Sequence, residues 1–188
     1  MTARPKATAD AARNINMTIE INRKKLITRR LCLALILLLL SVLQNTDGFF
    51  PQIFGVRALL LIPAVVCMSM YERDIYGMLL GLFAGALWDI FASGASFNAI
   101  YLLCVGFICG TLINTIMRNN VVTAAILSSA AILIYSVGYW LFKFVIGGLD
   151  SAVYMLLRYY LPGAAYTAAF IPLMFIIVRG VEKRFSVE

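Results

Sequence analysis

The sequence contains no histidine, and only nine of its 188 residues are aspartate or glutamate. Without histidine, the most common general base and the most common metal ligand in proteins are both missing. The four cysteines all fall inside apolar runs and form no C-x-x-C pair, so we interpret them as small packing residues. These absences predict a protein that is not an enzyme and that holds no metal or other cofactor.

Charged residues are also scarce, at 13% of the sequence, whereas 62% of the residues are hydrophobic. A soluble domain contains about 45–50% apolar residues. Several apolar runs approach the roughly 20 residues that a helix needs to cross the hydrocarbon core of a membrane. The runs are continuous and do not alternate with a period of two, which disfavours a transmembrane β-barrel. We therefore expect an all-α integral membrane protein.

Six apolar segments are the expected transmembrane helices of one bundle: 31–43, 57–71, 75–91, 97–117, 121–146 and 162–178. They form a predicted six-helix transmembrane domain over residues 29–180. A flexible basic tail (1–28) is expected before it and a short tail (181–188) after it. Pro172 predicts a kink in the last segment, and residues 151–160 predict a short helix at the membrane surface.

Basic residues gather on one side of the expected segments. If the amino terminus is cytoplasmic, 13 of the 16 lysines and arginines lie on the cytoplasmic side of the membrane. Such a bias orients membrane proteins, and it accounts for the net charge of +7 without a nucleic-acid partner. We therefore expect both termini in the cytoplasm and no binding of nucleic acid.

Glycines recur at every fourth residue of the third segment and again in the fourth, where an asparagine takes the next place: Gly77, Gly81, Gly85, Gly106, Gly110 and Asn114. Small residues at this spacing let two membrane helices approach closely. The turn between the two segments is centred near residue 95, and residues equally far from it should lie at equal depth. The sequence therefore predicts a helix-packing seam that pairs Gly85 with Gly106, Gly81 with Gly110, and Gly77 with Asn114.

A carboxylate, Asp89, follows these glycines near the carboxyl end of the third segment, where the helix dipole disfavours negative charge. Arg57 opens the second segment, and both residues are sixteen positions from the turn at residue 73, so their depths should match. Asn98, at the start of the fourth segment, is a further candidate donor. We predict an outer-face polar site formed by Asp89, Arg57 and Asn98, with a solvated carboxylate as the alternative.

The stretch GLFAGALWDIFASG (81–94) combines a G-x-x-x-G spacing with a Trp-Asp pair and a Ser-Gly turn: Gly81, Gly85, Trp88, Asp89, Ser93 and Gly94. Together with the segment LPGAAYTAAFIPLMFIIV (161–178), it resembles the MreD family of rod-shape-determining proteins. The resemblance implies a non-catalytic, multi-pass subunit of the cell-elongation machinery in the bacterial cytoplasmic membrane. The implied partners are membrane lipid, an MreC-type bitopic protein, an actin-like shape filament, and the glycosyltransferase and transpeptidase of lateral cell-wall synthesis.

Two other functions stay open. The fold of the family is thought to resemble the substrate-binding subunit of energy-coupling-factor vitamin transporters, which makes transport the main alternative. That subunit usually carries an A-x-x-x-A pair on its first segment, where this chain has only Ala34. A pocket with several polar groups at the outer end would favour transport. An intramembrane enzyme built on Ser128, Ser129 or Ser136 would lack a histidine to activate the serine.

Overall fold

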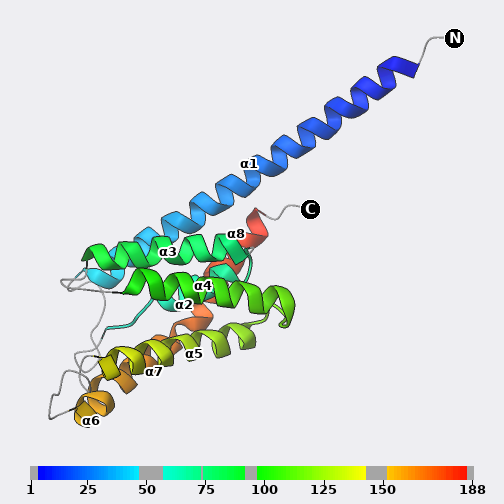
Figure 1. Cartoon of the computed structure of the whole chain (residues 1–188). Helices are drawn as coiled ribbons and strands as arrows, with labels where there is room; N and C mark the ends of the chain where they lie inside the picture. Colours follow the sequence, from blue (N-terminus) through cyan, green and yellow to red (C-terminus); the bar gives the residue numbers. More distant parts are fainter. Residues whose placement is uncertain (1–3, 47–56, 73, 92–96, 143–151, 186–188) are drawn as a thin grey trace.

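The computed structural model describes residues 4–46, 57–72, 74–91, 97–142 and 152–185, and for 4–19, 21 and 152 it describes the backbone only. The described residues are almost entirely helical and contain no β-strand, as the composition predicts. The elements in chain order are α1 (Arg4–Asn45), α2 (Leu61–Ser69), α3 (Asp74–Phe91), α4 (Asn98–Thr115), α5 (Val121–Trp140), α6 (Ala152–Met155), the π-helix η2 (Leu156–Tyr160), α7 (Leu161–Ala169) and α8 (Ile171–Arg184) (Figure 1).

Within the described residues, five helical stretches are long and apolar enough to cross a membrane: Asn22–Asn45, Asp74–Phe91, Asn98–Thr115, Val121–Trp140 and Val153–Arg184. The last of these contains α6, η2, α7 and α8 in succession. These are the helices of a multi-pass membrane protein, which is the class that the composition predicts. The segment expected over 57–71 is not among them.

The helix α2 is short and lies in the centre of the bundle, where all nine of its residues are buried. Nine residues rise only about 14 Å along an α-helix, less than half of a hydrocarbon core. Residues 57–59, expected to belong to the same helix, are not helical. Pro63 accounts for the late start, because a proline ring clashes with the carbonyl four residues earlier and is tolerated only in the first turn.

Contacts at its two ends show how far the α2 segment extends along α1. The Leu61 N–H donates to Gln44 Oε1 near the end of α1, at 3.1 Å. At the other end, Arg29 Nε donates to Glu72 Oε1 at 2.9 Å. Arg29 and Gln44 are fifteen residues apart on one helix, a rise of about 22 Å. The segment from Leu61 to Glu72 therefore runs antiparallel to α1 over most of that depth.

Residues 1–28 are predicted as a flexible tail, but α1 begins at Arg4 and makes this part of the chain helical. Figure 1 shows this part of α1 projecting well beyond the bundle. Two features of the sequence explain the helix. The apolar part of α1 supplies the nucleus, so each further residue only has to propagate the helix. Residues 4–28 contain no glycine, and their one proline, Pro5, lies in the first turn.

The last apolar stretch has two irregularities, and each is next to a proline. Pro162 follows η2. In a regular α-helix its ring would clash with the carbonyl of residue 158, and the wider π-turn avoids this clash. Pro172 follows the interruption between α7 and α8, at the place where the sequence predicts a kink. The helix α8 then continues to Arg184, past the domain boundary predicted at residue 180.

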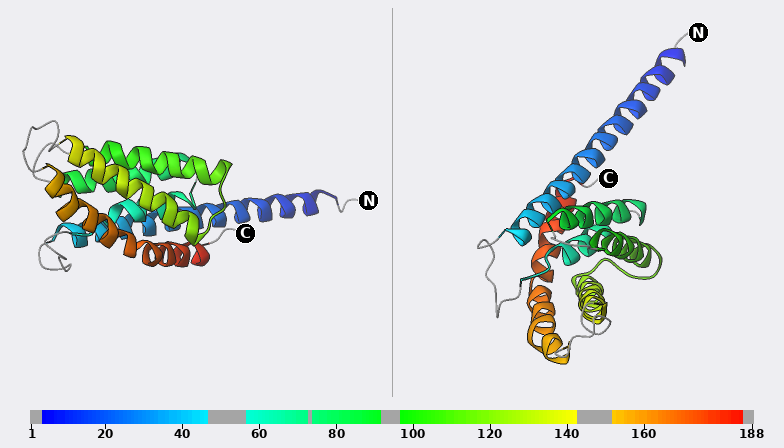
Figure 2. Two further views of the ribbon diagram at one scale, coloured as in Figure 1. Left: turned by 90° about the horizontal axis from the view of Figure 1, so that it is seen from below. Right: turned by 60° about the vertical axis from the view of Figure 1, so that its left-hand side comes forward.

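The two ends of the bundle carry different side chains. We call one the ion-pair end, where charged residues of α1, the α2–α3 turn and α8 meet: Arg29, Glu72 and Glu182. The other is the aromatic end, defined by ring contacts among Trp88, Tyr135, Tyr139 and Tyr160. The projecting part of α1 and the carboxyl end of α8 both leave the bundle at the ion-pair end (Figure 2).

The helices α3 and α4 form an antiparallel pair whose backbones touch at the glycines. A Cβ atom placed on Gly81 would lie 2.1 Å from the carbonyl oxygen of Leu102. One placed on Gly106 would lie 2.3 Å from the carbonyl oxygen of Gly77. No real Cβ approaches backbone this closely, so the present spacing of the two helices requires glycine at these positions. We keep the name glycine seam for this contact.

The register of the seam differs from the predicted one. Gly77 faces Gly106 instead of Asn114, and Gly85 lies against Asn98 and Ala99 instead of Gly106. The observed pairs are symmetric about a point between residues 91 and 92, whereas the prediction placed that point near residue 95. The prediction assumed that α3 ends at the same depth at which α4 begins. In the structure Gly85 already lies beside the first residues of α4, and α3 continues past them to Phe91. Asn114 donates its side-chain amide to Asp74 Oδ1.

We predict that Gly81→Ala destabilises the protein, because its methyl group would have to push the backbone of α4 away. Overpacking of this kind costs about 1–3 kcal/mol, measured as a lower unfolding temperature in detergent. Gly110→Ala should cost less, since its Cβ would lie 3.1 Å from the Asp74 Cα. Gly138→Ala is the matched control, because no atom lies within 4 Å of its Cβ position. Equal melting of all three variants would contradict the seam.

Candidate functional site

Asp89 caps the amino terminus of the neighbouring helix. Its Oδ2 accepts a hydrogen bond from the Ala99 N–H at 2.9 Å, and its Oδ1 accepts one from the Asn98 N–H at 3.2 Å. These are the first two amides of α4, whose own N-cap residue, Phe97, makes no side-chain cap. The cap of α4 is thus supplied by α3. This contact joins the two helices at the aromatic end.

Electrostatics explains why an acid is suitable at this place. Asp89 lies near the carboxyl end of its own helix, where the dipole is unfavourable, but it faces the amino end of α4, where backbone N–H groups and the dipole favour negative charge. Gly85, one turn earlier, brings the two backbones together, with its Cβ position only 2.4 Å from the Ala99 Cα. The glycine therefore puts α4 within reach of the carboxylate.

Arg57 was the predicted partner of Asp89, but in the part of the chain that the structure describes the hydrogen bonds to Asp89 come from α4 amides. Sequence separation gave both residues a similar depth, but depth does not determine which faces of two helices meet. The prediction considered only the dipole of α3 and overlooked that of α4. Asn98 does contribute a donor, through its backbone N–H.

Asn98 also connects the cap to α5. Its side-chain Oδ1 accepts a hydrogen bond from the Tyr135 hydroxyl at 2.7 Å. The Tyr135 ring lies 5.3 Å from the Trp88 ring and 5.2 Å from the Tyr101 ring, between centroids. Tyr101 in turn donates to the Ala131 carbonyl of α5 at 2.5 Å. The aromatic end thus links α3, α4 and α5 through hydrogen bonds and ring contacts.

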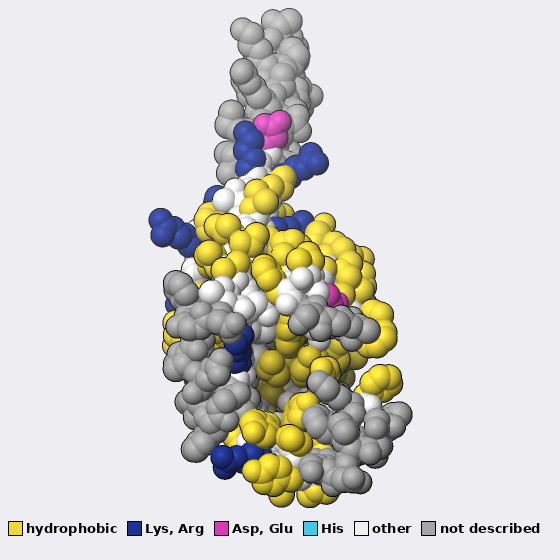
Figure 3. All heavy atoms as spheres, turned by 90° about the vertical axis from the view of Figure 1, so that its left-hand side faces the viewer, with side chains coloured by type: hydrophobic (Ala, Val, Ile, Leu, Met, Phe, Trp, Pro, Cys, Tyr) yellow, Lys and Arg dark blue, Asp and Glu magenta, His cyan; other side chains and the backbone are white. Residues whose placement is uncertain are grey.

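Arg57 lies, together with Tyr135, in the lining of a cavity of about 390 Å³. The cavity is lined by residues from the start of the α2 segment, from α5 and from the η2–α7 region: Arg57, Leu59, Tyr135, Ser136, Tyr139, Met155, Tyr159, Tyr160, Gly163 and Ala164. Figure 3 shows the aromatic end, where hydrophobic side chains line a hollow in the middle of the face. The three residues of the predicted outer-face site thus divide between the helix cap and this cavity.

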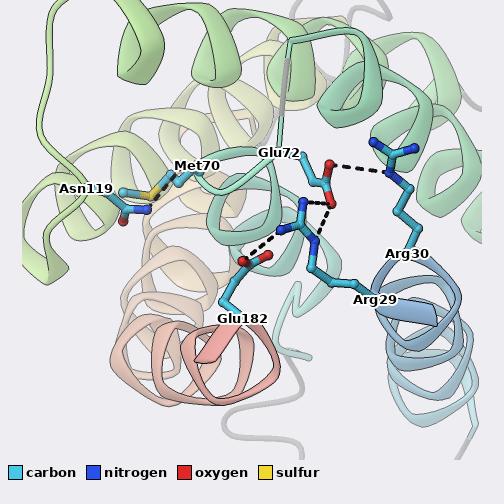
Figure 4. Close-up of polar contacts among 6 residues, drawn as sticks. All are labelled: Arg29, Arg30, Met70, Glu72, Asn119 and Glu182. Carbon is cyan, nitrogen blue, oxygen red and sulfur yellow. Dashed lines mark hydrogen bonds and ion pairs between the residues drawn. The ribbon is translucent and has the colours of Figure 1, made fainter. Parts of the chain in front are cut away.

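A cluster of charged residues that the sequence reasoning missed lies at the ion-pair end (Figure 4). Arg29 Nε and Nη2 both donate to Glu72 Oε1, at 2.9 and 2.5 Å, and its Nη1 donates to Glu182 Oε2 at 3.1 Å. Arg30 lies 3.5 Å from Glu72 and places its guanidinium 3.3 Å from the centre of the Tyr76 ring. The cluster therefore ties the first and last long helices to the turn between α2 and α3.

Burial makes this cluster a structural clamp. The Glu72 side chain is only 1% exposed and that of Arg29 12%, so neither charge is well solvated. A second contact supports the same turn, since Asn119 Nδ2 donates to the Met70 carbonyl at 3.2 Å (Figure 4). A signal for the clamp exists in the sequence, because Glu72 and Glu182 lie close in sequence to the ends of apolar segments, and ionisable residues near such segments tend to pair. Which faces of the helices bring them together is not readable from the sequence.

These polar groups offer no metal site in the residues that the structure describes, where no three cysteine, aspartate or glutamate side chains gather closely enough to hold an ion. The polar chemistry described at the two ends of the bundle consists of a helix cap, ion pairs and tyrosine hydrogen bonds. Such contacts hold helices together. The cavity beside Arg57 is one of several cavities with room for a small molecule.

We predict that Asp89→Ala lowers stability by about 1–2 kcal/mol, the usual cost of losing a helix cap. Asp89→Asn should cost less, because the amide oxygen keeps one acceptor. Thermal unfolding in detergent measures both effects. In a double-mutant cycle with Arg57→Gln, the losses should add to within about 0.5 kcal/mol, because the hydrogen bonds to Asp89 come from α4 amides. A larger coupling free energy would show that Asp89 and Arg57 interact.

We predict that Glu72→Ala is among the most damaging single substitutions at the ion-pair end. Removing one partner of a buried ion pair typically costs about 3–5 kcal/mol, because the other charge stays buried without compensation. Glu72→Gln should cost less, since its amide oxygen still accepts from Arg29. Arg118→Gln is the control, because Arg118 is exposed. The prediction fails if unfolding temperatures of the Glu72 and Arg118 variants fall equally.

Comparisons with protein-family models, with curated proteins and with solved structures found no significant match to this chain. They neither support nor oppose the resemblance to MreD proteins. The function is therefore proposed from the residues that carry the resemblance and from the contacts that those residues make in the structure.

Proposed function

We propose that this protein is a non-catalytic membrane subunit of the bacterial cell-elongation machinery, of the MreD type. In this role it scaffolds or regulates lateral peptidoglycan synthesis in the cytoplasmic membrane. Its proposed partners are an MreC-type bitopic protein, an actin-like filament, and the cell-wall glycosyltransferase and transpeptidase. It contributes no active site of its own.

The observation that carries this proposal is the role of the family-like stretch in the structure. Gly81 and Gly85 form the closest approach between α3 and α4. Asp89 caps α4, and Trp88 packs on Tyr135 of α5. The residues on which the resemblance rests thus jointly fix three helices relative to one another. A subunit that presents a fixed surface to partner proteins requires a junction of this kind.

We further propose that the chain crosses the membrane six times, with both ends cytoplasmic. The α2 segment supports the sixth crossing, because it accompanies α1 from the level of Gln44 to that of Arg29. Basic residues support the orientation: Arg29, Arg30, Lys183 and Arg184 belong to the two helices that leave at the ion-pair end. The positive-inside rule puts that end in the cytoplasm.

One observation favours the alternative, a substrate-binding subunit of an energy-coupling-factor vitamin transporter. Such a subunit needs a pocket with several polar groups near the outer face, and the cavity beside Arg57 includes Ser136 and four tyrosines. The first helix still lacks the expected alanine pair, since α1 has only Ala34 after Arg30. The elongation role therefore stays the first proposal.

The proposal is tested by depleting the protein from its rod-shaped bacterial host. We expect rounded or swollen cells with disordered lateral wall synthesis, seen by microscopy with a fluorescent wall label. Wild-type protein and Gly138→Ala should restore rods, whereas Gly81→Leu should not, because it forces α3 and α4 apart. Immunoblots of membranes must show that the variants accumulate, so that lost function is separated from lost protein.

Co-purification from membranes separates the two functions. Recovery of cell-wall synthesis proteins with the tagged chain supports the elongation role. Depleted cells that stay rod-shaped but need an external vitamin, together with recovery of an ATPase pair, would replace it with transport.

A further inference from the structure

We propose that a groove between α1 and α3 at the ion-pair end binds one anionic phospholipid, with an acyl chain between the two helices and the headgroup against Arg23 and Lys24. We call it the α1–α3 groove. The inference goes beyond the elongation role and does not depend on it. It rests on an apolar cavity, on the level at which the exposed surface of α1 changes from apolar to basic, and on the balance of charge around that level.

The groove is a cavity of about 340 Å³, within the usual range of ligand pockets, about 300–1,000 Å³. The two helices that line it diverge toward the ion-pair end (Figures 1 and 2). Apolar side chains form most of the lining: Ile27, Leu31 and Ala34 of α1, and Leu79, Leu80 and Phe83 of α3. Because these side chains offer no hydrogen bonds, the part of a ligand that lies among them must be apolar.

The depth of the groove matches a lipid chain. Leu31 is 65% exposed and Leu79 47% exposed, so the rim of the groove contacts the bilayer. Along α1 the lining runs from Ile27 to Ala34, a rise of about 10 Å. One leaflet supplies about 15 Å of the hydrocarbon core, and a transmembrane helix of a partner protein needs about 30 Å. A single acyl chain therefore fits the groove, whereas a partner helix would extend far beyond it.

Arg30 and Tyr76 join the two walls of the groove. The Arg30 guanidinium lies 3.3 Å from the centre of the Tyr76 ring, and its Nε lies 3.5 Å from Glu72 Oε2 without making a hydrogen bond (Figure 4). Glu72 already accepts two hydrogen bonds from Arg29. The Arg30 side chain is 30% exposed, so a lipid phosphate at the mouth of the groove can reach it.

The exposed surface of α1 changes from apolar to basic at the mouth of the groove. Among the side chains that the structure describes, Ile27 is the last large apolar one exposed on α1 toward the ion-pair end. Arg23, Lys24 and Lys25 on the preceding turn are all exposed. Arg23 and Lys24 lie about 4.5–6 Å beyond Ile27, and the headgroup layer is about 5–8 Å thick. Their charges therefore lie at the level of the lipid headgroups.

Arg23 and Lys24 also lie on the side of α1 that lines the groove. Arg23, Ile27, Arg30 and Ala34 follow one another at spacings of four, three and four residues, which places them along one face of an α-helix. Lys24 precedes Ile27 by three residues and so adjoins the same face. A headgroup bound by Arg23 and Lys24 therefore directs its acyl chain into the groove.

The balance of charge makes the preferred lipid anionic. The clamp is neutral by itself, because two arginines face two glutamates. Residues 20–25 then carry three basic side chains and one acidic side chain, Glu20. Within the described residues, no acidic side chain pairs with Arg23 or Lys24. Each basic residue near an anionic membrane surface strengthens binding about fivefold. Two such residues distinguish an anionic headgroup clearly from a zwitterionic one.

Native mass spectrometry of the full-length protein provides a direct test. Protein freed of lipid in an uncharged detergent is titrated with phosphatidylglycerol or with phosphatidylcholine of the same acyl chains, and the fraction that carries one lipid is measured. We expect the half-saturating concentration of phosphatidylglycerol to be lower by at least about tenfold, because Arg23 and Lys24 attract its net charge. Glycerophosphoglycerol, which is the headgroup without chains, should not displace the lipid.

Matched variants locate the binding. The double variant Arg23→Gln/Lys24→Gln should raise the half-saturating concentration of phosphatidylglycerol at least about tenfold, to near that of phosphatidylcholine. The double variant Arg118→Gln/Arg158→Gln removes the same charge from exposed positions outside the groove and should change little. Ala34→Phe fills the groove and should weaken the binding of both lipids. Melting curves establish that each variant is folded, and Ala34→Leu replaces Ala34→Phe if the latter is not.

Four results would overturn the proposal. Equal binding of the two lipids would show that the headgroup is not selected, and an equal loss in the Arg118→Gln/Arg158→Gln protein would show that only net charge matters. Displacement by glycerophosphoglycerol would identify a site for free phosphate. A folded Ala34→Phe protein that binds like the wild type would place the acyl chain outside the groove. None of these results bears on cell shape, so the elongation role is tested separately.

Discussion

The contact between the backbones of α3 and α4 is the constraint on which the rest of the structure depends. At Gly81 and Gly85 the backbones of the two helices approach too closely for any side chain. Only at this distance does Asp89 reach the first amides of α4. The position of α4 then determines where Asn98 and Tyr101 hold α5. Replacing one glycine would therefore disturb the helix pair, the cap and the aromatic end together.

The two ends of the bundle use different physical means to hold long helices in a medium that supplies no hydrophobic driving force between them. At the ion-pair end, Arg29 of α1 pairs with Glu72 and with Glu182 of α8, and each of these charges depends on its partner. At the aromatic end, tyrosine hydroxyls and rings provide many weaker contacts. The loss of one partner is costly at the ion-pair end, whereas the aromatic end leaves room for the cavity beside Arg57.

The core segment α2 connects these features. It is buried along its whole length. Arg57 and Leu59, which precede it, line the cavity beside Arg57, and the turn after it carries Glu72. The short buried helix α2 therefore connects the two ends of the bundle.

The sequence by itself determined the class of the protein, because apolar length and hydropathy follow from composition alone. It also determined the helix interruption next to Pro172 and the closeness of the glycine helices, because the missing amide of proline and the missing side chain of glycine act locally. Tertiary structure decided the register of that seam, the partner of Asp89 and the Arg29–Glu72–Glu182 clamp. Periodicity gives the depth of a residue along its helix, but the rotation and offset of packed helices depend on side-chain contacts along their whole length.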